Sequence, residues 1–264
     1  MAEKPACIRT LQPSDEKLVR FMIGKSIMEP LADANRRAVF HPLVISIWVA
    51  LSSVMVQLLG WWPKPEYGWM TYLAPLPAFG SWGVAILFFL DWFNRPYFED
   101  LLTLTLRKPD VGKIQEHYSL SPSSGFFILE YGGDFVGLIG IDASKESLQE
   151  KTIASMGERL DSKNKATSRI ATIRHFHVEP PFRKAKIQND LLKHALDHAF
   201  GASKTVQKVD GTDSPLVPYK TNCFKENGFG IEKTEGKLGL FGWALNLRTV
   251  DRATWEKAKK TRDS

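Results

Sequence analysis

The chain has 264 residues, 24% of them charged and 44% hydrophobic, with a formal net charge of +6. This composition is ordinary for a globular protein and excludes disorder of the whole chain, while the modest positive charge fits an anionic ligand or membrane surface and is too dilute for a nucleic-acid interface. Two cysteines, Cys7 and Cys223, stand far apart without partner spacing, so neither a disulfide framework nor a metal site is expected.

The chain begins with a polar segment. Residues 1–35 mix acidic and basic side chains, so no cleavable secretory signal is predicted there. Ile8–Leu11 is expected to form a short strand. A helix is then expected from Asp15, with Ser14 as its N-cap and acidic residues in its first turn.

Two long segments without charged residues follow. Residues 43–62 match the roughly 20 apolar residues that cross a bilayer, and residues 69–90 form a second run, interrupted by Pro75 and Pro77. Tryptophans flank both runs, as in an interfacial aromatic belt. The pattern predicts a transmembrane helical hairpin. The alternative is a buried helical hairpin in a soluble core.

The charges around the hairpin predict its orientation. Arg36 and Arg37 precede the first run and Arg95 follows the second, whereas the connecting turn carries only Lys64 and Glu66. Because basic residues stay on the cytosolic side, both termini and the large domain are expected in the cytosol.

The next region combines a helix and a β-hairpin. Residues 97–107 read as an amphipathic helix that ends before Pro109. Phe126–Tyr131 and Phe135–Ile141 read as two strands joined by a turn at Gly132-Gly133. Residues 144–167 are polar and lack periodicity, so they are expected to form a loop.

The last third alternates strands and helices, which predicts a mixed α/β domain. The expected elements are a strand at 168–178, a helix at 187–200, a helix at 219–227, strands near 231–234 and 240–247, and a basic helical tail at 252–264. Between the first strand and helix the chain reads Val178-Glu179-Pro180-Pro181-Phe182-Arg183-Lys184-Ala185-Lys186-Ile187-Gln188. The prolines stop the strand, and the basic loop leads into a helix N-terminus, whose free amides suit a phosphate group.

This strand, loop and helix resemble motif A of the GNAT acetyltransferase superfamily. Phe224-Lys225-Glu226-Asn227-Gly228-Phe229 is similar to that superfamily's late helix-to-strand signature. A membrane hairpin inserted after the first strand and helix resembles the membrane-bound branch that includes the cysteine S-conjugate acetyltransferases. The resemblance implies a GNAT-like mixed central sheet flanked by helices, with an inserted two-helix transmembrane hairpin. The implied parts are 1–39 and 96–250 for the acetyltransferase domain, 40–95 for the hairpin and 251–264 for the tail.

The resemblance also implies the reaction and its partners. Acetyl-CoA would donate an acetyl group to a primary amine, either on a small molecule or on a protein, by direct attack without an acyl-enzyme. The backbone amide of Val178 would polarise the thioester carbonyl, and the loop would hold the CoA phosphates through Arg183, Lys184, Ala185, Lys186, Ile187 and Gln188. A lipid bilayer is the expected second partner, and the endoplasmic reticulum is the location that the family suggests.

Two histidines are the candidate proton acceptors. His175 and His177 are two residues apart on the expected strand, so both imidazoles lie on one face, with Phe176 and Val178 on the other. Histidine titrates near neutral pH, so His177 is hypothesised to act as base or to hold a water, with His175 assisting. The alternative is that both histidines only pack beside the sheet. Glu179 and Glu130 are weaker candidates.

Three positions depart from the superfamily pattern. Lys186 and Gln188 stand where that pattern has small residues, and Phe224 stands where a tyrosine often protonates the leaving thiolate. Tyr219, about one helical turn earlier, is the expected substitute. Cys223 could be mistaken for a nucleophile, although no base is assigned to it. These departures leave open a catalytically inactive acyl-CoA-binding or scaffold protein, and a hairpin protein that only tethers membranes.

Overall fold

The structure is a computed structural model that describes residues 6–64, 66, 68–144 and 167–263. Its internal contacts divide the chain into two compact units. The first comprises Met1–Ile27, Leu102–Lys237 and Trp243–Ser264, and the second comprises Met28–Leu101 and Leu238–Gly242. Each unit is described by itself.

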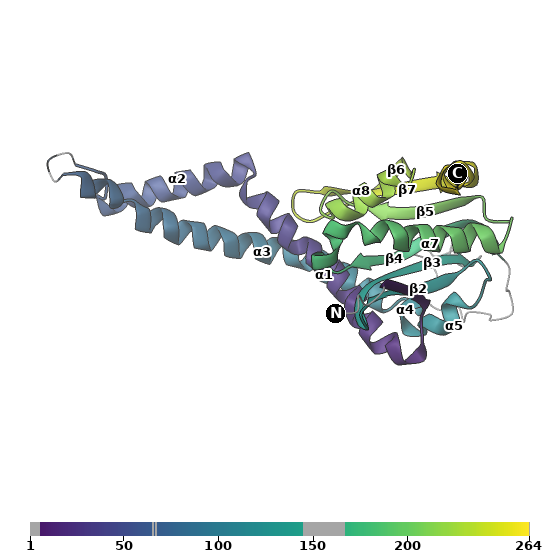
Figure 1. Cartoon of the computed structure of the whole chain (residues 1–264). Helices are drawn as coiled ribbons and strands as arrows, with labels where there is room; N and C mark the ends of the chain where they lie inside the picture. The colour runs from purple at the N-terminus through teal and green to yellow at the C-terminus, as the bar shows by residue number, and fades with distance from the viewer. Residues whose placement is uncertain (1–5, 65, 67, 145–166, 264) are drawn as a thin grey trace. The chain divides into compact units, whose positions relative to one another are not determined.

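The first unit contains a seven-stranded mixed sheet with the order β1-β2-β3-β4-β5-β7-β6 (Figure 1). Strands β1, β2, β3 and β4 pair in turn antiparallel, β4 pairs in parallel with β5, and β5 pairs antiparallel with β7. The strands are β1 Ala6–Thr10, β2 Gly125–Tyr131, β3 Asp134–Ser144, β4 Thr167–Val178, β5 Lys208–Asp213, β6 Gly230–Leu238 and β7 Trp243–Asp251. This sheet confirms the mixed α/β fold expected from the sequence.

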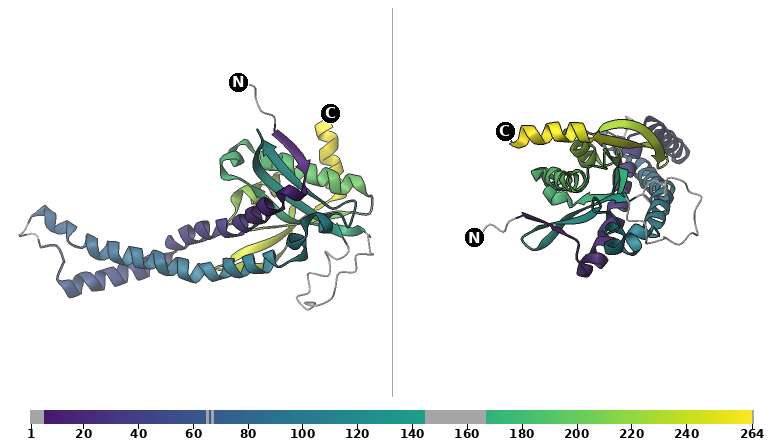
Figure 2. Two further views of the ribbon diagram at one scale, coloured as in Figure 1. Left: turned by 90° about the horizontal axis from the view of Figure 1, so that it is seen from below. Right: turned by 90° about the vertical axis from the view of Figure 1, so that its right-hand side faces the viewer.

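Alternating side chains of the strands build two cores, one on each face of the sheet. On one face Phe127 and Ile139 pack with α7, Ile187–Ala202, and α8, Pro218–Glu226. On the other face Phe126 and Leu138 pack with the start of α1, Glu16–Val39, and with α4, Pro109–Gly112, and α5, Ile114–Tyr118. The last helix, α9, Arg252–Asp263, projects from the end of β7 (Figure 2). The sheet is therefore covered on both faces, as the period-2 pattern of its central strands requires.

Several expected elements are confirmed. The β2–β3 hairpin turns at Gly132 and Gly133, whose positive φ angles of 68° and 90° only glycine adopts at little cost. Helix α7 buries the apolar face that the sequence predicts, namely Leu191, Leu192, Ala195, Leu196 and Ala199. Helix α8 lies within one residue of its expected bounds.

Four expectations need correction or extension. Ser14 is not an N-cap, because it lies inside a short 3-10 helix, Pro13–Asp15, where the Asp15 carboxylate accepts from the Gln12 amide. The expected helix at 97–107 is the end of a longer helix, α3, Leu76–Leu106. Strand β5 was missed, and the two last strands are longer than expected. The loop predicted at 144–167 lies almost entirely outside the described residues.

The second unit contains the long apolar helix α2, Pro42–Leu59, a 3-10 helix, Trp69–Leu73, and most of the long apolar helix α3, which ends at Leu106. The His41 side chain caps α2 at its start, and Gly60, at a φ of 65°, ends it. Trp48 donates to the Phe79 carbonyl at 2.9 Å, which joins the two helices. The two spans, Pro42–Leu59 and Trp69–Leu106, are long and apolar enough to cross a bilayer.

A buried polar contact holds the β6–β7 turn within this second unit. Asn94 is fully buried, donates to Asn35 at 2.8 Å and accepts from the Leu240 amide at 2.9 Å. The ring of Phe241 stacks on His41 at 4.2 Å. Residues 238–242 therefore belong to the second unit by contact, although they connect two strands of the first.

Candidate active site

Strand β4 loses one of its two neighbours partway along its length. It pairs with β5 only from Ile170 to Ile173, opposite Lys208 to Gly211, whereas its pairing with β3 continues to Val178. Within the described residues, Arg174–Val178 therefore have no partner strand on the β5 side. We name this segment the unpaired edge. On that side the Val178 carbonyl accepts from Nε of Arg183. A strand edge without a partner strand can offer backbone groups to a ligand.

A β-bulge sets the direction of the side chains on this edge. His175 pairs with Gly140 and Ile173 with Ile141, so Arg174 is the extra residue. Beyond the bulge, Phe176 and Val178 join the α7 core. His175 contacts Asp110 of α4, on the opposite face.

His177 lies beside a carboxylate. Its Nε2 is 3.5 Å from Oε1 of Glu179, and its side chain is fully buried. The same carboxylate binds Nζ of Lys25 through both oxygens, at 2.8 and 2.7 Å. The sequence singled out His177 and Glu179 separately, and the structure brings them together at the end of β4.

His175 is held by a buried acid that the sequence analysis missed. Its Nε2 lies 2.8 Å from Oδ2 of Asp110, and both residues are buried. Burial by itself raises the pKa of Asp110, but the His175 hydrogen bond and nearby positive charges outweigh it and hold that pKa below its usual value. The carboxylate can therefore fix the orientation of the imidazole ring.

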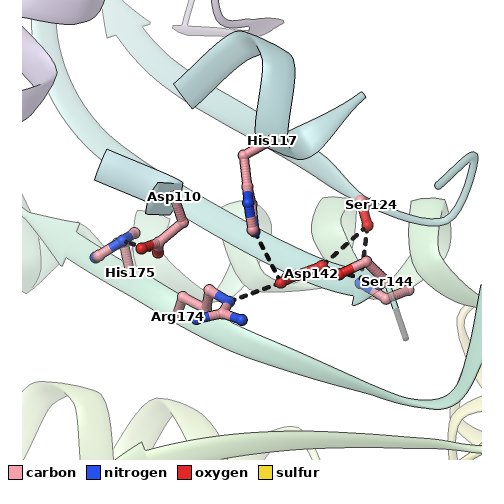
Figure 3. A network of polar contacts seen from close by, with 8 residues as sticks. Asp110, His117, Ser124, Asp142, Ser144, Arg174 and His175 are labelled. Carbon is pink, nitrogen blue, oxygen red and sulfur yellow. Dashed lines mark hydrogen bonds and ion pairs between the residues drawn. The ribbon is translucent and has the colours of Figure 1, made fainter. Parts of the chain in front are cut away.

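A second buried network stands beside this pair (Figure 3). Asp142 is fully buried and accepts from Nε of Arg174 at 2.7 Å. His117 Nε2 lies 3.0 Å from the same oxygen, and the Ser144 amide donates to the other at 2.9 Å. Burial raises the pKa of Asp142, yet His117 and Arg174 outweigh it and hold that pKa far below its usual range. The network fastens the bulge of β4 to β3 and α5.

The loop after β4 leads into α7 through a residue with a left-handed backbone conformation. Pro180–Ala185 forms a 3-10 helix, and Lys186 then adopts a left-handed conformation at φ 58° as α7 begins. Among the described residues it is the single non-glycine residue with positive φ. Its Nζ bonds Glu226 at 2.9 Å, and Asn189 bonds the other oxygen of that carboxylate at 2.7 Å.

The other loop residues divide into inward and outward groups. Arg183 points back and donates to the Val178 carbonyl at 2.7 Å. Gln188 is buried, and its amide donates to the Arg183 carbonyl at 3.3 Å, so its side chain folds under the loop. Ile187 packs partly against the core, whereas Lys184 and Ala185 are exposed.

Helix α8 presents three further candidates. The ring of Tyr219 lies 3.9 Å below the guanidinium of Arg183. Phe224 is fully buried and packs against Phe176. Burial raises the pKa of Cys223 to about 12, so its thiol stays protonated near neutral pH and is not an activated nucleophile.

The sequence analysis missed Asp110, Asp142 and Arg174, and only Asp142 carries a detectable signal. It is a charged residue after the apolar run of β3, a position that usually requires a buried partner. Among the described residues, no group of three or more His, Cys, Asp or Glu side chains could hold a metal ion.

Comparison with solved structures returned acetyltransferases of low identity. A spermidine N-acetyltransferase from Vibrio cholerae in complex with CoA and spermine is 12% identical, covers 95% of this chain and 98% of its own, and has a TM-score of 0.46. An N-acetyltransferase from Staphylococcus aureus Mu50 is 12% identical, with 94% and 98% covered and a TM-score of 0.46. A GNAT-family acetyltransferase from Streptococcus pneumoniae is 9% identical, with 94% and 99% covered and a TM-score of 0.45. A comparison with curated proteins found no match.

A match to a protein-family model assigns the chain to a family. The model of the acetyltransferase (GNAT) family matches residues 86–229, which is more than half of the chain. The match includes β4, the loop before α7 and helix α8. The chain therefore belongs to the GNAT acetyltransferase family and is an acyltransferase that uses acetyl-CoA as its co-substrate.

Proposed function

We propose that this chain is a membrane-anchored N-acetyltransferase, which transfers the acetyl group of acetyl-CoA to a primary amine by direct attack. The observation that carries the proposal is the unpaired edge, Arg174–Val178, which ends at a basic loop and a helix N-terminus. The edge offers backbone hydrogen bonds to the pantetheine arm, and the loop offers amides and positive charge to the phosphates.

The proposed chemistry needs a proton acceptor and an oxyanion donor. His177 takes the proton from the attacking amine, and its contact with Glu179 favours the protonated imidazole that results. Asp110 orients His175, which assists. The Val178 amide stabilises the charge that develops on the thioester oxygen. Tyr219 remains the sequence-based prediction for the proton donor to sulfur.

The exposure of the two apolar helices in the second unit supports the membrane anchor. In the apolar stretches of the two candidate spans only 17% and 11% of the residues are buried. A helical hairpin in the core of a soluble protein would be mostly buried, so this exposure favours the bilayer over that alternative. We place the anchor at residues 40–95, in the endoplasmic reticulum, with residues 1–39, 96–250 and the 251–264 tail in the cytosol.

The anchor guides the choice of amine. A site tethered to a bilayer favours a lipophilic small amine, because such molecules concentrate at the membrane surface. An amino-acid conjugate such as a cysteine S-conjugate fits this description, and a protein amine is the other option. S-benzyl-cysteine is a suitable probe, with S-methyl-cysteine testing lipophilicity and N-acetyl-S-benzyl-cysteine as the blocked control. Release of the free CoA thiol reports turnover.

Charge reversal at Lys186 is expected to weaken acetyl-CoA binding. A solvated charge contact is worth about 1 kcal/mol at 4 Å, so replacing an attraction by a repulsion raises Kd by about 30-fold. Isothermal titration of the detergent-purified full-length protein with acetyl-CoA measures Kd for the wild type and for Lys186→Glu. Binding of the wild type should weaken as salt concentration rises.

Two variants control this measurement. Lys204→Glu makes the same charge change just beyond the opposite end of α7 and should leave Kd unchanged. Lys186→Gly removes the charge but suits the left-handed backbone, so it should bind with intermediate affinity in a folded protein. Equal effects of Lys186→Glu and Lys204→Glu would contradict a phosphate site at the loop.

The anchor is tested by vesicle association. The full-length protein is expected to float with phospholipid vesicles after an alkaline carbonate wash. Val54→Asp places a charge on an exposed apolar position of α2, where a central carboxylate costs about 2.5–3.5 kcal/mol, and should weaken insertion. Leu18→Asp makes the same kind of change on α1 and should float normally. Release of the wild-type protein by the wash would rule out a spanning hairpin.

The alternative is an inactive acyl-CoA-binding or scaffold protein, and it rests on the three departures from the superfamily pattern, Lys186, Gln188 and Phe224. Titration with acetyl-CoA and release of the CoA thiol separate this alternative from the enzyme. Tight binding of acetyl-CoA without release of thiol across an amine panel would favour the scaffold. Release of thiol that depends on a free amine favours the enzyme.

A further inference from the structure

Departure of the CoA sulfur needs a cationic or acidic group beside it. When the amine nitrogen bonds to the acetyl carbon, the C–S bond breaks and sulfur leaves with the electron pair. A thiolate in a partly desolvated site is costly unless a positive charge or a proton meets it. Phe224 cannot supply either.

The ring of Phe224 on α8 lies against the residues at which the pairing of β4 with β5 ends. A Cβ atom built on Gly211, the last residue of β5 paired with β4, would lie 2.8 Å from Cζ of Phe224. The same ring packs against Phe176, which lies on the unpaired edge, at 5.8 Å. The Phe224 ring therefore spans from β5 to the edge, and no glycine-to-alanine change is tolerated at Gly211 without moving it.

Lys220 stands one turn before Phe224 on the same helix face. Its Nζ lies 5.7 Å from the centre of the Phe224 ring. Among the described residues no hydrogen bond or ion pair to this ammonium is found, in contrast to Tyr219, whose ring is covered by Arg183. A lysine held over an aromatic ring near the end of the edge is thus available to a ligand.

Two titratable side chains act on Lys220, one from β5 and one from its own helix, α8. Asp213 of β5 lies near it, but one oxygen of that carboxylate already accepts from Nε of Arg248 of β7 at 2.7 Å. Cys223 of α8 is the other neighbour, and it stays a neutral thiol. The side chain of Lys220 is half-buried, and desolvation lowers its pKa to about 8, with Asp213 and Cys223 opposing this change. The amine therefore gives up a proton near neutral pH far more readily than an ordinary lysine.

We propose that Lys220, in place of the Tyr219 expected from the sequence, is the catalytic residue that meets the departing CoA thiolate and gives it a proton. This inference rests on the proposed direct attack. The amine nitrogen gains the acetyl carbon and loses a proton to His177. The sulfur takes the C–S electron pair and the proton of Lys220 Nζ. Solvent then takes the proton from His177 and returns one to Lys220, so that atoms and charges balance over the cycle.

The decisive measurement is the pKa of the CoA thiol bound to the full-length protein, which requires no knowledge of the amine. The ultraviolet absorbance of the thiolate is followed against pH, and the absorbance of protein without CoA is subtracted. An ammonium within contact distance lowers a thiol pKa by about one unit or more. We expect that shift in the wild type and in Lys220→Arg, and its loss in Lys220→Met. Tyr219→Phe should keep it.

Turnover separates charge from proton donation. Lys220→Met and Lys220→Arg should both lower kcat about 100-fold, since arginine keeps the charge but does not release its proton, while KM for acetyl-CoA stays near the wild-type value. Lys204→Met, at an exposed lysine beyond α7, should change neither readout.

The outcomes distinguish this inference from the proposed function. If the wild type binds CoA but the thiol pKa is equal in the wild type and Lys220→Met, the role of Lys220 is wrong and the acetyltransferase stands. Loss of the shift in Tyr219→Phe alone would assign the role to Tyr219. A folded wild type that does not bind CoA would overturn the proposed function itself.

Discussion

Replacing His177 by alanine is expected to lower kcat by about 100- to 10,000-fold, the usual contribution of a general base. The reason is position. His177 lies on the unpaired edge, next to the Val178 amide that is proposed to hold the thioester oxygen, and its imidazole contacts Glu179. Any part of the acidic limb of the kcat/KM profile that comes from the imidazole should disappear, which leaves only the limb set by ionisation of the amine substrate.

A second histidine provides the matched control. His198 on α7 is half-buried, and its Nε2 lies 3.0 Å from the Ser124 carbonyl. This histidine is not part of the unpaired edge and does not contact it in any of these interactions. His198→Ala should leave kcat and the pH profile unchanged in folded protein. If His177→Ala retained turnover and the same pH profile, the histidines would be packing residues and Glu179 would become the first candidate base.

Replacing Asp142 by asparagine is expected to destabilise the first unit by about 3–5 kcal/mol, the cost of breaking a buried ion pair from one side. Arg174 would keep its buried charge without a carboxylate, and His117 would lose its acceptor. Denaturant unfolding in detergent, followed by circular dichroism, measures the change. Asp134→Asn, an exposed acid at the start of the same strand, should have little effect.

The stability of the wild type should also depend on acid. The folded pKa of Asp142 is far below its ordinary value of about 3.9, so its contribution is present above that value and is lost as pH falls towards the folded pKa. Asp142→Asn should therefore flatten the loss of stability below about pH 4. If Asp142→Asn lost stability below pH 4 as steeply as the wild type, other carboxylates would be the cause of the acid sensitivity.

The two predictions are connected through the bulge at Arg174. Asp142 holds Arg174, and Arg174 is the extra residue that turns His175 and His177 to one face and Phe176 to the other. A variant of Asp142 that still folds should therefore lose activity as well as stability. Loss of both activity and stability is expected where one buried network supports the backbone of a site.

Local sequence patterns predicted most of the elements. The β2–β3 hairpin follows from its paired glycines, and α7 from its apolar spacing, because turn geometry and helical periodicity depend only on neighbouring residues. The motif residues around Arg183 also identified the loop, and the family match includes them. The histidine roles stay predictions.

Strand β5 shows where local patterns fail. Lys208–Asp213 contains two acids and a glycine, which favour a turn. Its acids are buried because β7 supplies partners: Thr249 donates to Asp210 at 2.7 Å and Arg248 to Asp213 at 2.7 Å. These partners are more than 30 residues away, so no local pattern could predict the strand.

The sequence by itself therefore determined the apolar hairpin segments, the main helices and strands, and the loop that belongs to a GNAT motif. Only the tertiary structure decided which distant residues lie together: Asp110 with His175, Asp142 with Arg174, and Lys25 with Glu179. The physical reason is that periodicity and turn chemistry act over a few residues, whereas a buried charge is stabilised by whichever distant group the fold brings within hydrogen-bond distance.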